Sequence, residues 1–198
     1  GLLIMAKELR IGIIGLMGYG STYFRTIAGI EGARVTALCD AREDMLQRAA
    51  AQHNVSRTHT DYRQLVNDSE VDAVFIATPH FLHYQMTMAA IAAGKHVFCE
   101  KPLAMNAREA EEMVQAAKAA GVKLGCRYNR RQSPHVKMLK QAVSQGLLGD
   151  VYAMNAKWMA RYTAFMFSPA SAWRIDKNKA GGGILIGRGS HMIDAALY

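Results

Sequence analysis

The stretch Arg10–Gly20, RIGIIGLMGYG, decides the fold, because a short apolar run leads directly into a glycine-rich turn. Such runs, rich in β-branched residues and without strict alternation, are typical of strands buried on both faces of a parallel sheet. Similar runs follow at residues 34–39, 72–77, 95–99 and 122–126, with helical patterns between them. The alternation predicts an α/β fold with a doubly wound parallel sheet and right-handed crossovers.

The helices between these strands have recognisable ends. Asp61 and Asn106 each stand three residues before a Gln or Glu, which is the spacing of a capping box. We expect a helix over residues 82–93 to end at Gly94, and the helix that begins at Asn106 to end at Gly121.

The pattern changes after Cys126. Residues 133–146 begin with Ser-Pro and predict a helix, and the partial alternation of residues 150–160 predicts a longer strand. Residues 161–180 have no clear period and are expected to form a loop. The three glycines at 181–183 are expected to open a last helical stretch.

Composition sets further limits. The chain has 198 residues, of which 51% are hydrophobic and 20% charged, so it can bury a core and is neither disordered nor a disulfide-rich scaffold. This length allows one large domain or two small ones. With the change of pattern, we predict a first domain over residues 5–127 and a second domain over residues 128–198.

The charge balance bears on the partner. The 24 basic and 16 acidic residues give a net charge of +8, which suits an anionic small molecule and also weak nucleic-acid binding. The basic residues are scattered, and Arg130–Arg131 is the only adjacent pair. We therefore favour a solvated basic surface, with no nucleic-acid partner. No apolar run approaches the roughly 20 residues that a membrane helix needs, so no membrane partner is expected either.

Cysteine use indicates the compartment. Cys39, Cys99 and Cys126 each close an apolar run, and none belongs to a CxxC pair. Buried reduced thiols and a reducing compartment are the favoured interpretation. The first six residues lack the features of a targeting signal, so we expect a cytoplasmic protein.

The turn after the first strand has the pattern of a dinucleotide site. Gly15 and Gly20 occupy the outer positions of a G-x-G-x-x-G motif, while the middle position is Met17, a departure from that motif. Gly18 follows and gives the loop freedom to adjust, with Tyr19 beside it. The amides of such a turn and the helix N-terminus can hold a diphosphate. The alternative is a glycine-rich turn without a ligand.

Asp40 ends the second predicted strand, 20 residues after Gly20. A carboxylate there can accept hydrogen bonds from the adenosine ribose and repels a 2′-phosphate, which favours NAD over NADP. Arg42 stands close enough to keep NADP as the alternative. Asp40 could also cap the helix that begins near Arg42, and it could do both.

Two further loops end at the same predicted edge of the sheet. Thr78 and Pro79 follow the strand at 72–77 and could line the nicotinamide end of a cofactor site. His80 and His83 form an HxxH pair, but no other ligands cluster with them in the sequence, so no metal is expected. We expect His83 to cap or to pack against the next helix.

The other loop contains Glu100, Lys101 and Pro102, directly after the strand at 95–99. A lysine at this edge could bind a substrate hydroxyl and the nicotinamide ribose, and its ammonium would stabilise a developing alkoxide. Glu100 could hold Lys101 or the loop, and the Lys101–Pro102 bond is a candidate for a cis peptide. The alternative is a solvated surface lysine.

The last motif is GGGILIGRGSHMID, residues 181–194. On a regular helix, Gly187, His191 and Asp194 share one face. A histidine titrates near neutrality and suits proton transfer, and Asp194 could orient it. In isolation, a packed histidine with a solvated aspartate is the favoured interpretation.

Taken together, six segments resemble one family, the Gfo/Idh/MocA oxidoreductases, which include the glucose–fructose oxidoreductase and inositol dehydrogenase types. The segments are GIIGLMGYG, ALCD, VFIATPHFLHY, AGKHVFCEKPLAMN, YNRRQSP and GGGILIGRGSHMID. The resemblance implies an N-terminal Rossmann domain, followed by the start of an α/β substrate domain with an open, mostly antiparallel sheet. Members of the family are longer, so the chain resembles a C-terminally truncated member, and a homo-oligomer is expected for the full-length form.

The resemblance also implies roles for individual residues. Lys101 and His191 correspond to catalytic residues, and both would contact substrate together with Asp194. Inositol dehydrogenase-like members have an aspartate where this chain has Gly187, followed here by Arg188. The expected cofactor-binding residues are Gly15, Met17, Gly18, Tyr19, Gly20, Asp40, Arg42, Thr78, Pro79, Glu100 and Lys101.

The function that follows is an NAD(P)-dependent oxidoreductase with NAD as the preferred cofactor. It would transfer hydride between the nicotinamide and a secondary alcohol of a sugar, cyclitol or related polyol. The alternative is a dinucleotide-binding module without turnover, as expected for a truncated or catalytically altered member.

Overall fold

The structure is a computed structural model that describes residues 8–159, 168 and 171–198. The chain divides after Cys126 into two compact units, and each is described by itself.

The first unit is built on a parallel sheet with strand order β3-β2-β1-β4-β5-β6. The strands are β1 (Leu9–Ile14), β2 (Ala33–Cys39), β3 (Arg57–His59), β4 (Ala73–Ile76), β5 (His96–Cys99) and β6 (Leu124–Cys126). Five of them lie within a residue or two of the predicted runs, which confirms the doubly wound sheet. The sequence analysis missed β3, because its three residues, Arg-Thr-His, are polar and lie at the edge of the sheet.

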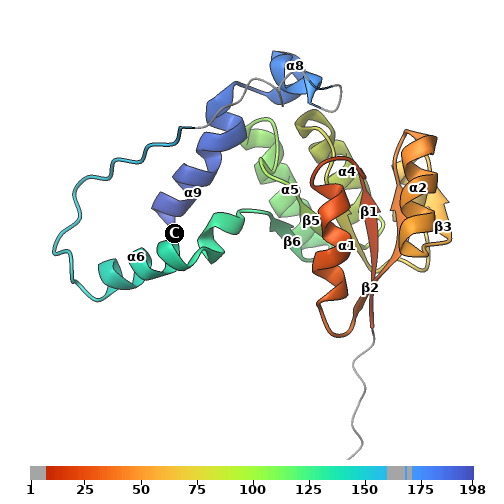
Figure 1. The fold of residues 1–198 in the computed structure, drawn as a ribbon, viewed down its shortest axis with the longest axis horizontal. Coiled ribbons are helices and arrows are strands. Elements are labelled where there is room, and N and C mark those ends of the chain that lie inside the picture. Colours follow the sequence, from red (N-terminus) through yellow and green to blue (C-terminus); the bar gives the residue numbers. More distant parts are fainter. Residues whose placement is uncertain (1–7, 160–167, 169–170) are drawn as a thin grey trace, which may run out of the picture. The chain divides into compact units, whose positions relative to one another are not determined.

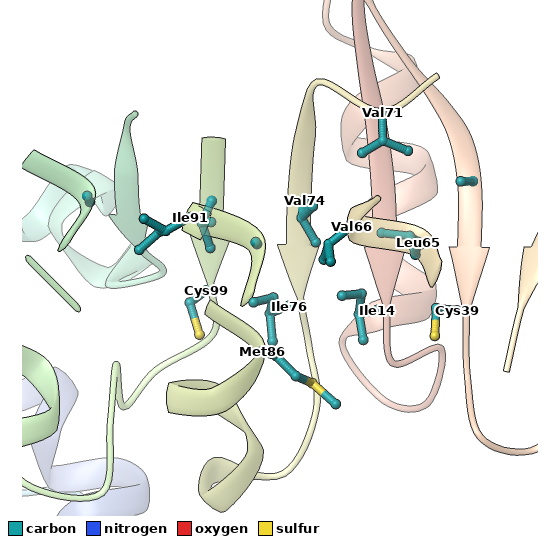
Figure 2. Close-up of a cluster of buried hydrophobic side chains, with 14 residues drawn as sticks. Ile14, Cys39, Leu65, Val66, Val71, Val74, Ile76, Met86, Ile91 and Cys99 are labelled. Carbon is teal, nitrogen blue, oxygen red and sulfur yellow. The ribbon is translucent and has the colours of Figure 1, made fainter. Parts of the chain in front are cut away.

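Helices cover both faces of this sheet (Figure 1). They are α1 (Gly20–Ala28), α2 (Glu43–His53), α3 (Tyr62–Val66), α4 (His80–Ala92) and α5 (Ala107–Ala119). One buried cluster joins α1 and α2 to strand residues such as Ile11 and Ile13. The other joins α3, α4 and α5 to residues such as Ile14 and Ile76 (Figure 2). Because neighbouring strand residues serve opposite faces, burial of both faces produces the near-continuous apolar runs of the sequence.

The helix ends follow the predicted signals in part. The Asp61 side chain accepts a hydrogen bond from the Arg63 amide at 2.9 Å, and Asn106 accepts one from the Glu109 amide at 2.9 Å. Ser133 precedes α6 (Pro134–Ser144) as expected, but its side chain makes no capping hydrogen bond there.

The second unit departs from the sequence predictions in two places. No strand forms over residues 150–159, where 150–160 was predicted to be one, and Tyr152 is 98% exposed. Partial alternation is insufficient because a strand also needs a partner to accept its backbone hydrogen bonds, and the described residues provide none. The predicted loop over 161–180 contains two short helices in its described part; residues 160–167 and 169–170 lie outside the described chain.

The remaining elements of the second unit are short. They are η1 (Asn129–Gln132), η2 (Ala172–Ile175), α8 (Lys177–Ala180), the π-helical turn η3 (Leu185–Gly189) and α9 (Ser190–Leu197). The open, mostly antiparallel sheet that the family resemblance implies has no strand among the described residues of this unit. The predicted last helix exists, but a π-helical turn interrupts its first part.

Two properties of the whole described chain bear on its environment. No helix in residues 8–159 and 171–198 combines the length and the apolar character that crossing a membrane requires. The three cysteines are thiols; Cys39 and Cys99 are buried as expected, whereas Cys126 is only half-buried. Burial raises the pKa of Cys39 to about 12, so it stays protonated at neutral pH.

Candidate dinucleotide-binding and catalytic site

The sheet topology gathers most of the predicted site residues at one edge. All strands run parallel, so the residues that follow β1, β2, β4 and β5 emerge at the carboxyl edge. The strand order reverses between β1 and β4, and ligands bind at such a switch point in open α/β sheets. Gly15–Gly20 and Thr78–Pro79 flank the switch point, with Asp40 on one side and Glu100–Lys101 on the other.

The turn after β1 requires glycine at both of its ends. Gly15 has a φ of +88°, which side chains rarely adopt, and a Cβ there would lie 2.9 Å from the Ala77 backbone. A Cβ on Gly20 would lie 1.8 Å from the Gly15 carbonyl oxygen, so α1 can begin this close to the strand only at a glycine. Gly18 has a φ of +59°, and a Cβ there would meet no atom of the described residues beyond its chain neighbours within 4 Å.

This turn exposes backbone donors. Within the part of the chain that the structure describes, the amides of Met17 and Gly18 make no hydrogen bond. The first turn of α1 contains no acidic residue, and no side chain caps it. Free amides beside a helix N-terminus are the groups that hold a phosphate, so the turn suits an anion. Methionine at the middle position of the motif does not prevent this arrangement of the backbone.

Asp40 connects the turn to the helix that follows β2. Its Oδ2 accepts a hydrogen bond from the Leu16 amide at 2.8 Å, and its Oδ1 accepts one from the Arg42 amide at 2.9 Å. Helix α2 begins at Glu43 with Arg42 at the N-cap position, so Asp40 lies before the cap and is not the capping residue itself. Each carboxylate oxygen keeps a second lone pair that a ribose hydroxyl could use.

Thr78 and Pro79 end the loop after β4 and are both half-buried. The HxxH pair belongs to α4, with His80 as its first residue. His83 was expected to cap or pack against the next helix. It is fully buried and therefore packed, and its ring also contacts two backbone carbonyls, those of Thr78 and Pro102, at 2.9 and 2.8 Å. The described residues contain no cluster of three or more groups that could hold a metal ion.

Glu100 is buried and connects α1 to the loop after β5. Its Oε1 accepts a hydrogen bond from the Tyr23 hydroxyl of α1 at 2.8 Å, and its Oε2 accepts a longer one from the Lys101 amide at 3.3 Å. Glu100 thus holds the loop, as the sequence suggested. The Lys101–Pro102 bond is cis, as expected, and Lys101 is half-buried at the edge of the sheet.

The remaining candidates lie in the second unit. His191 and Asp194 are both buried in α9, and the His191 ring meets that of Tyr128 edge-on, with centroids 6.0 Å apart. Both oxygens of Asp194 accept hydrogen bonds from the Arg131 guanidinium, at 2.8 and 2.6 Å. Asp194 is therefore not the solvated aspartate that was predicted, and it pairs with Arg131 rather than with His191. The hydrogen bonds from Arg131 to this carboxylate raise the pKa of Arg131.

Gly187 stands where inositol dehydrogenase-like members have an aspartate, and it lies in an irregular part of the backbone. Gly187 falls inside the π-helical turn η3, whose wider spacing breaks the regular face that Gly187 was expected to share with His191. The Arg188 guanidinium lies over the Trp158 ring, 5.1 Å from its centroid, and Arg130 lies at the same distance.

Sequence reasoning missed three residues of these sites. Tyr23 has no local signal, since its role depends on Glu100, 77 residues further along the chain. Arg131 was noted as part of a basic pair and of the segment YNRRQSP, but no role was predicted for it. His83 was noted as a possible ligand, and nothing in the HxxH spacing indicated its two carbonyl partners.

Comparison with known proteins gives the class of the first unit. Residues 9–128 match a family model described as an oxidoreductase family with an NAD-binding Rossmann fold. Residues 136–198 match a model described as a GFO/IDH/MocA C-terminal domain. The chain therefore belongs to the GFO/IDH/MocA family, as its motifs indicated.

Its relatives include sugar and polyol enzymes. The chain is 33% identical over 189 residues to a 1,5-anhydro-D-fructose reductase of Ensifer adhaerens, covering 96% of this chain and 56% of that protein. It is 33% identical over 190 residues to a myo-inositol 2-dehydrogenase of Thermotoga maritima, covering 96% and 54%. The chain thus spans about half the length of these curated relatives.

Solved structures similar to this chain are also those of dehydrogenases. The WlbA dehydrogenase of Bordetella pertussis, in complex with NADH and UDP-GlcNAcA, is similar with a TM-score of 0.85 and 27% identity, covering 96% of this chain and 55% of that one. A myo-inositol 2-dehydrogenase from Lactobacillus plantarum gives a TM-score of 0.85 and 29% identity, covering 96% and 56%.

Proposed function

We propose that this chain is part of an NAD(P)-dependent oxidoreductase that transfers hydride between a nicotinamide cofactor and a secondary alcohol of a sugar, cyclitol or related polyol. The observation that supports this proposal most is the turn Gly15–Gly20, where two amides that make no hydrogen bond to any described residue stand beside the N-terminus of α1. Relatives named as reductases and dehydrogenases of sugars and inositols support the substrate class.

The residues of the first unit fit a dinucleotide. In this proposal the amides of Met17 and Gly18 hold the diphosphate, and the open space beside Gly18 leaves room for it. Tyr19, 43% exposed, and the half-buried Thr78 and Pro79 line the rest of the site. The positively charged end of the α1 dipole contributes further attraction.

Asp40 makes NAD the preferred cofactor in this proposal. Its carboxylate already accepts amides of the turn and of the next loop, which fixes its direction. A ribose diol can donate to the remaining lone pairs, whereas a 2′-phosphate would meet a like charge. Arg42 is the one residue of the proposed set that would favour NADP, so the preference is expected to be moderate.

The chemistry is divided between the two units. The cofactor, when bound, accepts or donates the hydride. Lys101 polarises the reacting oxygen through its ammonium group, and His191 accepts or returns the hydroxyl proton. Asp194 contacts substrate only in competition with Arg131, which already binds both of its oxygens.

Arg131 also favours the second candidate, a dinucleotide-binding module without turnover. Its bidentate pair with Asp194 removes the carboxylate from His191, and Gly187 supplies no acid in its place. A cytoplasmic location, which the reduced cysteines favour, and a homo-oligomeric full-length form complete the proposal.

A fluorescence titration of the chain with NADH and NADPH tests the proposal. We expect saturable binding of both, with NADH tighter. Turnover is then tested on the longest natural form of the protein with a panel of myo-inositol, scyllo-inositol, D-glucosides and levoglucosan. Binding without turnover of any secondary alcohol would favour the binding module, and failure to bind either dinucleotide would refute both candidates.

A further inference from the structure

His83 joins the two loops at the edge of the sheet. It lies in the first turn of α4, its side chain has no exposed surface, and both ring nitrogens face backbone carbonyls. Nδ1 lies 2.8 Å from the Pro102 oxygen, in the loop after β5. Nε2 lies 2.9 Å from the Thr78 oxygen, in the loop after β4. One side chain therefore touches two of the four loops that carry predicted site residues, the loop with Thr78 and the loop with Lys101.

The two contacts cannot both be hydrogen bonds in the neutral ring. Carbonyl oxygens only accept, and a neutral imidazole has a single N–H. Burial lowers the pKa of His83, so the ring is neutral at neutral pH. Glu100 nearby opposes this effect, while the Lys101 ammonium reinforces it. One contact is thus a hydrogen bond, and at the other a ring lone pair faces an oxygen.

The surroundings decide which nitrogen carries the proton. The contact with the Pro102 oxygen is buried, whereas the contact with the Thr78 oxygen is only partly buried. A carbonyl without a donor costs more where water cannot replace the missing bond. The missing donor therefore costs less at the partly buried contact with Thr78, which favours the proton on Nδ1.

We propose that His83, as its Nδ1–H tautomer, is a positioning residue that holds the Pro102 carbonyl and thereby sets the place of Lys101. Pro102 directly follows Lys101, so the restraint acts one residue from the proposed catalytic ammonium. The Glu100 carboxylate contacts the same segment through a hydrogen bond from the Lys101 amide, 3.3 Å long. The proposal rests on the proposed function only in giving Lys101 a catalytic role; the restraint itself can be measured without cofactor or substrate.

The first test reads the tautomer directly. Long-range ¹H–¹⁵N correlation spectra of the labelled 198-residue chain distinguish Nδ1–H, Nε2–H and imidazolium rings, and backbone assignment identifies His83 among the seven histidines. We expect the Nδ1–H pattern at neutral pH. An Nε2–H ring or an imidazolium would overturn the proposal, and this test requires no variant.

The second test replaces His83 with two residues that have amide side chains. Each of them keeps a hydrogen-bond donor at only one of the two positions that the ring nitrogens occupied. In His83→Asn the amide nitrogen lies near the former Nδ1, and in His83→Gln it lies near the former Nε2. The readout is the rate at which acetic anhydride acetylates Lys101, measured by mass spectrometry against the exposed Lys118 of the same chain. We expect His83→Asn to keep the wild-type ratio and His83→Gln to change it roughly three- to tenfold, as expected for losing one hydrogen bond.

The outcomes separate positioning from packing. An unchanged ratio in His83→Gln, or an equal change in both variants, would overturn the proposal, since packing alone does not depend on which donor remains. Thermal unfolding of both variants checks that each is folded when its acetylation ratio is compared with that of the wild type. NADH titration of the same samples separates the two claims: wild-type protein that does not bind NADH refutes the proposed function and leaves the His83 results valid.

Discussion

The two units of the chain differ in how far they bury their own apolar residues. In the first, both sheet faces are covered, and Ile13, Leu38 and Ile76 have no exposed surface. In the second, Leu147 is 70% exposed and Leu197 is 81% exposed. Apolar exposure on this scale is unusual in a self-contained domain. The difference teaches that cofactor binding can be derived from the first unit alone, while the proposed proton transfer depends on a unit whose described residues do not complete a core.

The largest expected effect tests whether cofactor binding and catalysis depend on different residues. Lys101→Ala and His191→Ala, made in the longest natural form, should each lower turnover by at least about a hundredfold, because each removes a group that acts on the reacting hydroxyl. Dinucleotide binding should stay largely intact in both variants, because neither change touches the turn after β1 or Asp40; His191→Ala should leave the NADH dissociation constant within about twofold, and Lys101→Ala should lose at most the ribose contact of the ammonium. Steady-state kinetics and fluorescence titration measure the two quantities. Full turnover in either variant would show that the assigned residue is not catalytic.

A second comparison places the same substitution in each unit. Gly20→Ala puts a Cβ 1.8 Å from the Gly15 carbonyl oxygen, so α1 must shift. We expect a loss of about 1–3 kcal/mol of stability and weaker NADH binding by more than about tenfold. Gly183→Ala in the second unit is the matched control, because no atom of the described residues beyond its chain neighbours lies within 4 Å of the added Cβ. Thermal unfolding and NADH titration decide; equal effects of the two substitutions would contradict the packing argument.

The cofactor preference should depend on one aspartate only. Asp40→Ala should weaken NADH about tenfold or more and NADPH less, because it removes an acceptor for the ribose together with a charge that repels a 2′-phosphate. Asp194→Ala, in the second unit, should leave the ratio of the two affinities unchanged. Parallel titrations measure both ratios. If Asp40→Ala weakens the two cofactors equally, the ribose role is wrong.

The smallest expected effect concerns the buried carboxylate. Tyr23→Phe removes the hydroxyl that donates to Oε1 of Glu100 and should cost about 1 kcal/mol of unfolding free energy, because Glu100 is buried. Tyr84→Phe removes a similar bond, 2.6 Å long, to Glu112, whose side chain is 39% exposed. It should cost less, because water replaces the lost partner. Urea unfolding compares the two variants, and a larger loss in Tyr84→Phe would refute this ranking.

The sequence predicted what local pattern controls. Apolar runs located β1, β2, β4, β5 and β6, and parallel topology then placed Asp40, Thr78 and Lys101 at one edge. The three-residue strand β3 escaped because pairing with β2, rather than apolar character, holds it in place.

Other features depend on contacts between residues far apart in the chain. The Tyr23–Glu100 bond and the Arg131–Asp194 pair join residues 77 and 63 positions apart, and no spacing rule reveals them. The prediction of a strand at 150–160 was wrong over the described residues 150–159. Here the local pattern was present, but no partner strand exists among the described residues.

The central claim is that the turn after β1 holds a diphosphate while Asp40 holds the adjoining ribose. Amide ¹H–¹⁵N spectra of the chain, recorded while NADH is added, test it most directly. The account predicts saturable shifts that are largest at the amides of Met17, Gly18 and Asp40. Shifts confined to other residues, or no shifts at saturating NADH, would contradict it.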